Sequence, residues 1–552
     1  MNNTLYRVIS SFFIMLVLVV IQTAAQSTVE STKKTQSDDA EHIVLPDVST
    51  KLGLDRQDID KAAIPDFTTV LPDSIADRDN LPVLQDGTDE VSALTAISQK
   101  QTDAEIVPVY LEGIIAGGYP GIFTGKFNVY QTSGSNPFSI SFSHEAINGY
   151  GRHKVSEGFN NSETSLLGSK KIRASEKIVF DGKAEYNTST WGLQNKSPFF
   201  YNMSRQYLGA LVQMETQFNE GFLLKTSVVT SHVSRFAGFT GILSDGILTD
   251  SSIVLISPSI KGIYTKGKLL AAFEGEYSFT SFDSSVSKNN DIVHYANAGL
   301  GLSYTFFECI QTEAGIEGVF STNAHTYSML PFYGGLRITA PFVNLGLKGG
   351  LESDQTDTAA LQKKHPYVQF ENAPKTETLW FGVFDAYLPF MQKYAINLNL
   401  NFAKTAFDNL QLLPNYSQKT ASGMYKSSYQ DTMSLFSVLA FSMQFSHIGI
   451  DAGWNARWLD VAANSKVHEV FANFSYAASN EMGGLQIQLL QALVKPDFPQ
   501  IRFLGFYQIA QSIQVELALN DMLLLFTGED RLIAGDYCGQ GGSFSLGMKL
   551  FF

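Results

Sequence analysis

From residue 106 to its end, the chain is dominated by segments in which apolar and polar side chains alternate. In residues 396–402, four apolar side chains alternate with Asn397, Asn399 and Asn401. Successive side chains of a β-strand point to opposite faces, so each such segment predicts a strand with one apolar and one polar face. The whole region predicts about 20 to 22 strands.

The apolar face of these strands is largely unbroken, whereas the opposite face is neutral or charged. A soluble all-β protein would also alternate, but it would carry charges on its outer face. Three consecutive inward amides at 397, 399 and 401 suit a wet lumen better than a dry core. The pattern therefore favours lipid outside and water inside, in a transmembrane antiparallel up-and-down β-barrel.

Connections between the predicted strands fall into a short and a long class, which is typical of outer-membrane barrels. Short turns are expected at 119–121, 133–137, 266–267, 479–484 and 512. Long outside loops are expected at 148–171, 353–375, 408–431 and 527–541. The strand assignment between residues 169 and 204 is the least distinct part of the pattern.

The strand predicted from residue 448 supplies candidates for both faces of the barrel wall. Trp454 and Trp458 lie in its apolar register and are expected to anchor the barrel at a membrane interface. The polar residues that we expect to line the lumen are Asn397, Asn399, Asn401, Asp451, Asn455, Arg457 and Glu516. Such residues either tune which solute passes or only keep the barrel interior hydrogen-bonded.

The last ten residues alternate strictly and end on an aromatic side chain. Their pattern resembles the terminal signal of bacterial outer-membrane barrels, Gly-x-x-apolar-x-aromatic, which Gly547, Leu550 and Phe552 match. Leu546 departs from it, since that position is usually polar. The resemblance implies recognition of the final strand by the barrel-assembly machinery, and an ordinary sandwich strand is the alternative.

The first 25 residues have the features of a secretory signal peptide. A short segment with one cation, Arg7, precedes an apolar run over 8–21 and the small-residue site Thr23-Ala24-Ala25. The apolar run is too short for a comfortable transmembrane helix, and no later stretch reaches about 18 apolar residues. Export without a helical anchor points to the outer membrane of a diderm bacterium.

Residues 26–105 differ from the rest of the chain, with 17 acidic and 7 basic residues and therefore a net charge of −10, against −14 for the whole chain. With Phe67 as its only aromatic residue, this segment predicts a mostly disordered periplasmic leader. It contains a short internal repeat, Pro46-Asp47 and Pro65-Asp66, and each copy lies in a stretch where proline favours an extended backbone. Either stretch could add as a strand to the sheet of a periplasmic partner, or the repeat arose by chance.

Composition agrees with a membrane barrel and gives no sign of catalysis. Charged residues make up 17% of the chain, below the roughly one quarter usual in soluble proteins, and aromatic residues make up 12%. The nine histidines show no metal-ligand spacing, and there is no nucleophile motif or phosphate loop. We therefore expect no enzyme activity, metal, cofactor or nucleic-acid partner. Cys309 and Cys538 are more simply two separate thiols than one disulfide.

The carboxy-terminal end is similar to the barrel of TonB-dependent receptors. In that family a strand ends in an Asn-bearing apolar tip, a loop follows, and a last strand ends in Phe; residues 518–523, 527–541 and 544–552 fit this order. The family's folded plug domain has no counterpart here, because the 80-residue leader contains only Gly53 and Gly87. The lumen is then occluded by the leader, by loops or by another protein, or it is open.

Two functions follow as expectations. The first is an outer-membrane channel or transporter for a polar solute, working, if energised, through a periplasmic partner that holds the leader. The second is a non-transport anchor or assembly protein that acts through its surface loops or its leader.

Overall fold

The computed structural model describes residues 109–132, 136–239, 247–284, 289–323, 328–370, 373–390, 393–420, 422–459, 467–478, 482–493, 498–510 and 512–552. The predicted signal peptide and the predicted acidic leader lie outside these residues. The barrel domain was predicted to begin at residue 106, and its first described strand starts at Tyr110.

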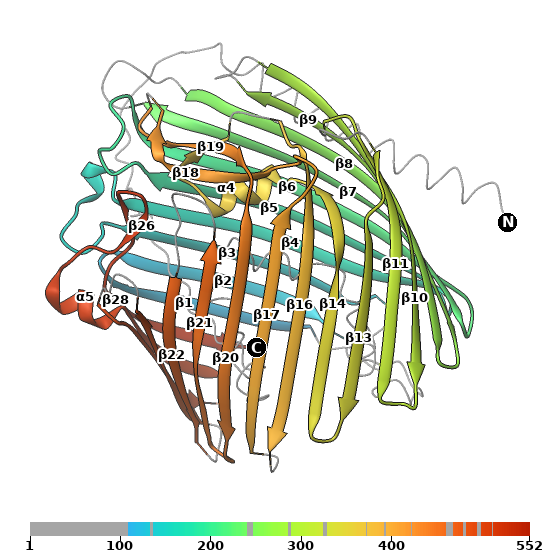
Figure 1. Ribbon diagram of the computed structural model, residues 1–552. Helices are drawn as coiled ribbons and strands as arrows, with labels where there is room; N and C mark the ends of the chain where they lie inside the picture. The colour runs from blue at the N-terminus through green and yellow to red at the C-terminus, as the bar shows by residue number, and fades with distance from the viewer. Residues whose placement is uncertain are drawn as a thin grey trace. The chain divides into compact units, whose positions relative to one another are not determined.

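Twenty-two antiparallel strands form one closed sheet in chain order (Figure 1). They are β1 (Tyr110–Tyr119), β2 (Ile122–Gln131), β3 (Phe138–Asn148), β4 (Asn160–Ser175), β5 (Ile178–Gly192), β6 (Phe200–Asn219), β7 (Phe222–Phe239), β8 (Ile247–Lys266), β9 (Leu269–Ser284), β10 (Asn289–Phe306), β11 (Ile310–Ser321), β13 (Phe332–Ala340), β14 (Val343–Gln355), β16 (Thr376–Phe390), β17 (Tyr394–Thr405), β20 (Met433–Gln444), β21 (Ile448–Leu459), β22 (Val467–Ala477), β23 (Gly483–Ala492), β24 (Gln500–Ala510), β25 (Ile513–Asn520) and β28 (Ser543–Phe551). The predicted all-β up-and-down barrel and its strand number are confirmed.

The remaining elements lie in the connections. They are η3 (Val155–Glu157), β12 (Ser328–Met329), α4 (Thr358–Lys364), β15 (Val368–Gln369), β18 (Gln411–Lys419), β19 (Tyr425–Gln430), α5 (Met522–Thr527), β26 (Leu532–Ala534) and β27 (Tyr537–Cys538). β15, β18 and β19 form a separate small sheet, and β26 pairs with β27. No helix among the described residues is long and apolar enough to cross a membrane.

The last strand closes the barrel, as its sequence predicted. β28 pairs with β25 on one side and with β1 on the other, where Glu112 lies opposite Phe551 and Tyr119 opposite Phe544. Residues facing each other in these ladders share a face, so the apolar register from Phe544 to Leu550 lies outside with Ile115. Among the described strands the barrel sheet is left with no unpaired edge, which is a requirement for backbone surrounded by lipid.

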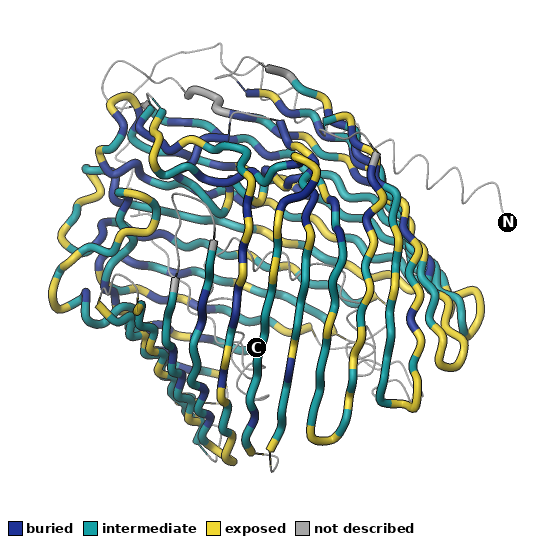
Figure 2. The backbone as a smooth tube through the Cα atoms, in the orientation of Figure 1, coloured by how far each residue is buried: buried dark blue, intermediate teal, exposed yellow. Residues whose placement is uncertain are grey.

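Burial alternates along most strands (Figure 2). On β28, Ser543, Ser545 and Lys549 are buried, while Phe544 and Leu546 are exposed. Exposed apolar side chains on the outer face are expected for a barrel that meets hydrocarbon. Phenylalanines also gather at the end with the short turns, where Phe307 is 81% and Phe342 is 70% exposed. They have the position of one aromatic girdle.

The two ends of the barrel differ as predicted. Short connections such as 176–177, 220–221, 267–268 and 511–512 lie at one end, and long connections such as 356–375, 406–432 and 521–542 lie at the other. In outer-membrane barrels the short turns face the periplasm, so the long loops are expected outside the cell. The predicted loop 148–171 is wrong, because β4 begins at Asn160 and the connection spans only 149–159.

Each strand from β4 to β10 contains 15 to 20 residues. A tilted strand crosses the hydrocarbon core with about 9 to 11 residues. These strands therefore extend beyond the bilayer, where both faces can be polar. That is why the polar start of β4 lacked the alternation expected of a strand.

Candidate functional site

The predicted asparagine ladder lies on the inner face of β17. Asn399 donates to the carboxylate of Asp385 on β16, and Asn401 Nδ2 donates to Asn399 Oδ1 at 2.7 Å. Asn397 shares their face, opposite Tyr387. The ladder is thus extended by a carboxylate that the sequence pattern did not single out, because Asp385 belongs to a different strand.

Asp451, Asn455 and Arg457 face inward on β21. Asp451 is 7% and Asn455 is 3% exposed, and Asn455 lies opposite Glu469 of β22. Within the described part of the chain, neither amide atom of the Asn455 side chain has a hydrogen-bond partner. A buried amide without partners is costly, so this part of the lumen wall is suited to contact another polar group.

Glu516 lies on the inner face beside the closing seam of the barrel. Its Oε1 accepts a hydrogen bond from Gln514 Nε2 at 2.7 Å. On the neighbouring strand Lys549 forms an ion pair with Glu112 of β1. Lys549 is almost fully buried and was not predicted, since it appeared only as the polar partner of apolar residues in the last strand.

Trp454 and Trp458 lie on the outer face of β21, in register with Leu439 and Leu435. Their rings pack edge-on with centroids 6.1 Å apart, and His468 of β22 stacks on Trp454 at 5.7 Å. The cluster lies toward the loop end of the strand. Its role as a membrane-interface anchor stays a prediction.

A cap of loop residues covers part of the outer mouth. We define the cap as the described residues of 149–159, 193–199, 356–375, 406–432 and 521–542. Its apolar core joins loop and wall residues: Leu193, Phe200, Met203, Ala237, Tyr367, Val368, Phe370, Leu412, Met424, Tyr425 and Tyr537. Tyr367 and Tyr537, from loops 170 residues apart, stack with ring centroids 3.9 Å apart.

Arg235 of β7 attaches the cap to the barrel wall. Its guanidinium donates to the backbone oxygens of Val368 and, at 2.7 Å, Pro366, both in the β14–β16 loop. Arg205 of β6 donates to Ala359 O of α4 at 3.2 Å. Arg235 is fully buried, and hydrogen bonds to a charged group are stronger than neutral ones, so these contacts hold the loop inside the mouth.

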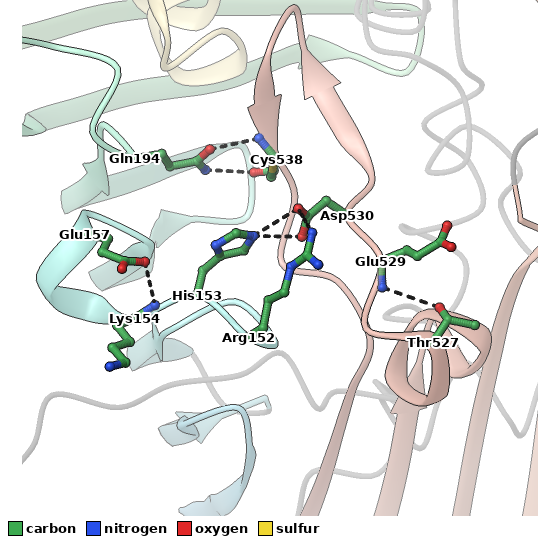
Figure 3. Close-up of polar contacts among 9 residues, drawn as sticks. All are labelled: Arg152, His153, Lys154, Glu157, Gln194, Thr527, Glu529, Asp530 and Cys538. Atoms are coloured by element: carbon green, nitrogen blue, oxygen red, sulfur yellow. Dashed lines mark hydrogen bonds and ion pairs between the residues drawn. The ribbon is translucent and has the colours of Figure 1, made fainter.

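The β25–β28 loop is fastened to two neighbouring loops (Figure 3). Asp530 accepts a hydrogen bond from Arg152 Nη2 at 3.0 Å, and His153 Nε2 lies 2.9 Å from both of its oxygens. Gln194 makes two hydrogen bonds with the backbone of Cys538, each of 2.8 Å. The loop is therefore held at both its middle and its end.

A second carboxylate of the same loop, Asp536, is fastened from another side. It accepts hydrogen bonds at 2.7 Å from Lys419 Nζ and from the Tyr425 hydroxyl, both of the β17–β20 loop. Lys196 Nζ lies 3.9 Å away. Sequence reasoning missed these contacts, because they join residues that lie far apart in loops without periodicity.

Near neutral pH, the ionised carboxylates of Asp530 and Asp536 stabilise the contacts that hold the β25–β28 loop in the cap. Burial alone would raise the pKa of the Asp530 carboxyl, but hydrogen bonds from His153 and Arg152 outweigh it and hold the pKa below its usual value. The pKa of Asp536 is lowered in the same way, since Lys419 and Tyr425 outweigh burial. Burial raises the pKa of the Tyr367 phenol to about 12, so this ring stays neutral.

Beneath the β25–β28 loop lies a cavity of about 530 Å³. Residues of β3, β4 and β5 line one side, residues of β24 and β25 line the other, and the loop itself forms part of the boundary. We call this space the subcap cavity. Among the described residues no group of His, Cys, Asp or Glu could hold a metal ion, and Cys309 and Cys538 are separate free thiols.

No family model matches the chain, and no curated protein matches it. Solved structures with the same fold are receptors and transporters. The FrpB iron transporter from Neisseria meningitidis (F5-1 variant) is 10% identical with a TM-score of 0.63, covering 80% of this chain and 82% of its own. The siderophore receptor PirA from Pseudomonas aeruginosa is 9% identical with a TM-score of 0.58, covering 82% and 81%. The copper transporter OprC is 9% identical with a TM-score of 0.59, covering 82% of each chain.

These likenesses establish the fold. The predicted resemblance to the barrels of TonB-dependent receptors is confirmed. The chain thus has the barrel fold of these receptors and transporters. The predicted lack of a plug falls on residues outside the described part of the chain.

Proposed function

We propose that the chain is a gated outer-membrane transporter for a small polar solute. The observation that carries this proposal is the cap, in which loops from four connections share an apolar core and a fifth, 149–159, packs and hydrogen-bonds against the β25–β28 loop at one end of a polar-walled barrel. A barrel of 22 strands without any occlusion would leave a wide aqueous hole. Specific contacts such as that of Asp530 with Arg152 therefore support a regulated passage rather than a permanently open pore.

The lumen wall supports a solute route rather than a dry core. Side chains such as Asn399, Asp451, Arg457 and Glu516 face the interior on β17, β21 and β25. Inward polar and charged side chains tune which solutes pass through barrels. We propose that these residues, with Asn397, Asn401 and Asn455, line that route.

Single-channel conductance in planar bilayers tests the proposal. The wild-type chain should show small or rare openings, and a variant combining Asp530→Asn, Asp536→Asn and Gln194→Ala should open more often or more widely. Glu529→Gln is the matched control, because Glu529 lies beside Asp530 but its carboxylate points away from these contacts (Figure 3). If neither chain conducts, even after deletion of residues 26–103, the barrel is an anchor and the proposal fails.

The acidic leader is the natural place for a periplasmic partner, because its charge of −10 calls for a basic surface. We propose that the stretches at Pro46-Asp47 and Pro65-Asp66 form the contact. Residues 26–105 used as bait should co-purify a periplasmic protein, and exchanging Asp47 and Asp66 for Lys should abolish this. Equal recovery with the exchanged bait would contradict the assignment.

A further inference from the structure

The subcap cavity carries a positive charge that has no partner among the described residues. Arg531 lines it but is satisfied, since its Nε and Nη2 donate to Asp521 at 2.9 and 3.2 Å. Arg502 of β24 also lines the cavity and is exposed. Within the described residues it makes no ion pair and no hydrogen bond.

Arg502 lies opposite Gln488, and two residues farther along the same ladder Leu504 lies opposite Gln486. Residues two apart on a strand share a face, so these four side chains all point to the inner face. A guanidinium presents several donors in a planar fork that matches the two oxygens of a carboxylate. An exposed arginine that forms no ion pair with the described residues is therefore available to an anionic group from outside the chain.

Uncharged donors and acceptors line the same cavity as this charge. Gln500 and Asn520 line the same side of the cavity, and Gln540 contributes a buried side-chain nitrogen that has no partner in the described structure. Trp191 lines the opposite wall with an indole ring. Amides bind hydroxyl groups, and an indole face packs against the C–H groups of a flat polar ring.

The opposite wall also carries two carboxylates, Glu145 and Glu163. Glu163 accepts a hydrogen bond from Asn187 Nδ2 at 2.7 Å, and Lys363 Nζ of α4 lies 3.8 Å from it. Carboxylates accept hydrogen bonds from hydroxyl groups but repel a second anion. An anionic ligand is therefore oriented, with its charge toward Arg502 and its hydroxyl groups toward Glu145 and Glu163.

We infer that the subcap cavity binds a small polyhydroxylated carboxylate, of the kind represented by a sugar acid. The volume of about 530 Å³ lies within the range of small-molecule sites and suits one or two sugar rings. This inference rests on the proposed transport function and names the class of solute that the barrel would admit. Arg502 selects the anionic solute over its neutral analogue.

Fluorescence of Trp191 provides a test inside the cavity itself. The chain has four tryptophans, and Trp380→Phe, Trp454→Phe and Trp458→Phe leave Trp191 as the sole reporter in the full-length protein. Galacturonate and galactose serve as probes, since they differ in one carboxylate. Galacturonate should change the signal saturably and bind at least about tenfold more tightly than galactose, as a charge-assisted hydrogen bond implies.

Arg502→Gln should remove that preference and Arg502→Lys should restore part of it, whereas Arg173→Gln, an exposed arginine outside the cavity, should leave it unchanged. Isothermal titration of the same variants checks binding without the reporter. Equal affinity for both sugars, no binding of either, or full preference in Arg502→Gln would overturn the inference. Uptake into liposomes separates the two proposals. Binding of galacturonate without uptake would support the binding site but contradict the transport function. Uptake that does not depend on Arg502 would support the transport function but contradict the binding site.

Discussion

At the scale of single residues, Gly118 shows how closely the closing seam of the barrel is built. It faces inward on β1, opposite Ser545 of β28. A Cβ at this position would lie 1.9 Å from Phe544 O and 2.6 Å from Ser545 Cα. Both are backbone atoms, so the contact cannot be relieved by rotating a side chain.

Gly118→Ala is therefore expected to destabilise the closed barrel by about 1 to 3 kcal/mol, the usual cost of forcing extra volume into a packed site. The measurement is the midpoint temperature at which the barrel loses its compact migration on a gel. Gly113→Ala is the matched control on the same strand, because its nearest neighbour would be Lys126 O at 3.9 Å. A Gly118→Ala midpoint equal to that of Gly113→Ala would contradict the account.

Asp530 gives a second prediction, based on pH. Its folded pKa lies below the unfolded value near 3.9, so its contribution to stability is complete above pH 5 and disappears as the pH falls through the folded pKa. Because the site is partly exposed, we expect Asp530→Asn to cost about 1 kcal/mol at pH 7. Urea titrations of wild type and variant should differ at pH 7 and coincide near pH 2. A difference of the same size at both values would rule out the charge as its origin.

The residues that periodicity could reveal are those on membrane-spanning strands. The inward register of Asn399 and Asp451 follows from a two-residue period, and the structure places both on the inner face. Periodicity says nothing about which strands meet across a seam, so the pair of Lys549 and Glu112 was not predictable. The same holds for Arg502, whose importance comes from a missing partner.

At the scale of elements, the long connections were located by sequence but not their internal structure. β18 and β19 form a hairpin within a segment predicted only as a loop, and β15 joins them in parallel through Val368 and Tyr425. Turn and loop composition marks where strands end. Packing between loops depends instead on contacts over long sequence distances, such as Tyr367 with Tyr537, which no local pattern encodes.

The contact between Gln194 and Cys538 makes the position of the β25–β28 loop measurable. Burial raises the pKa of the Cys538 thiol, and the two hydrogen bonds to its backbone hold it in place. In a Cys309→Ser background, Gln194→Ala should increase the rate at which maleimide labels Cys538 severalfold, because the loop opens more often. Gln540→Ala, a change in the same loop away from these bonds, should have little effect. Unchanged labelling in Gln194→Ala would show that the loop is held by other contacts.

At the scale of the whole molecule, the strand number and the up-and-down order followed from counting alternating segments. The count held despite the weak pattern between residues 169 and 204, because β4, β5 and β6 still each carry alternating outward residues such as Leu166, Tyr186 and Leu208. The same two-sided logic, lipid outside and solvent inside, fixes the closed sheet, since an open edge has no place in a bilayer. It does not fix which end faces the periplasm.

Chemical labelling of the two cysteines tests that orientation. Cys309 lies in the short β10–β11 connection and Cys538 in the long β25–β28 loop, at opposite ends of the barrel. With long loops outside, a membrane-impermeant maleimide added to intact cells should label Cys538→Ser protein poorly and Cys309→Ser protein well. After the outer membrane is permeabilised, both proteins should be labelled, which controls for the reactivity of each thiol. Preferential labelling of Cys309 in intact cells would invert the barrel and place the cap and the subcap cavity on the periplasmic side.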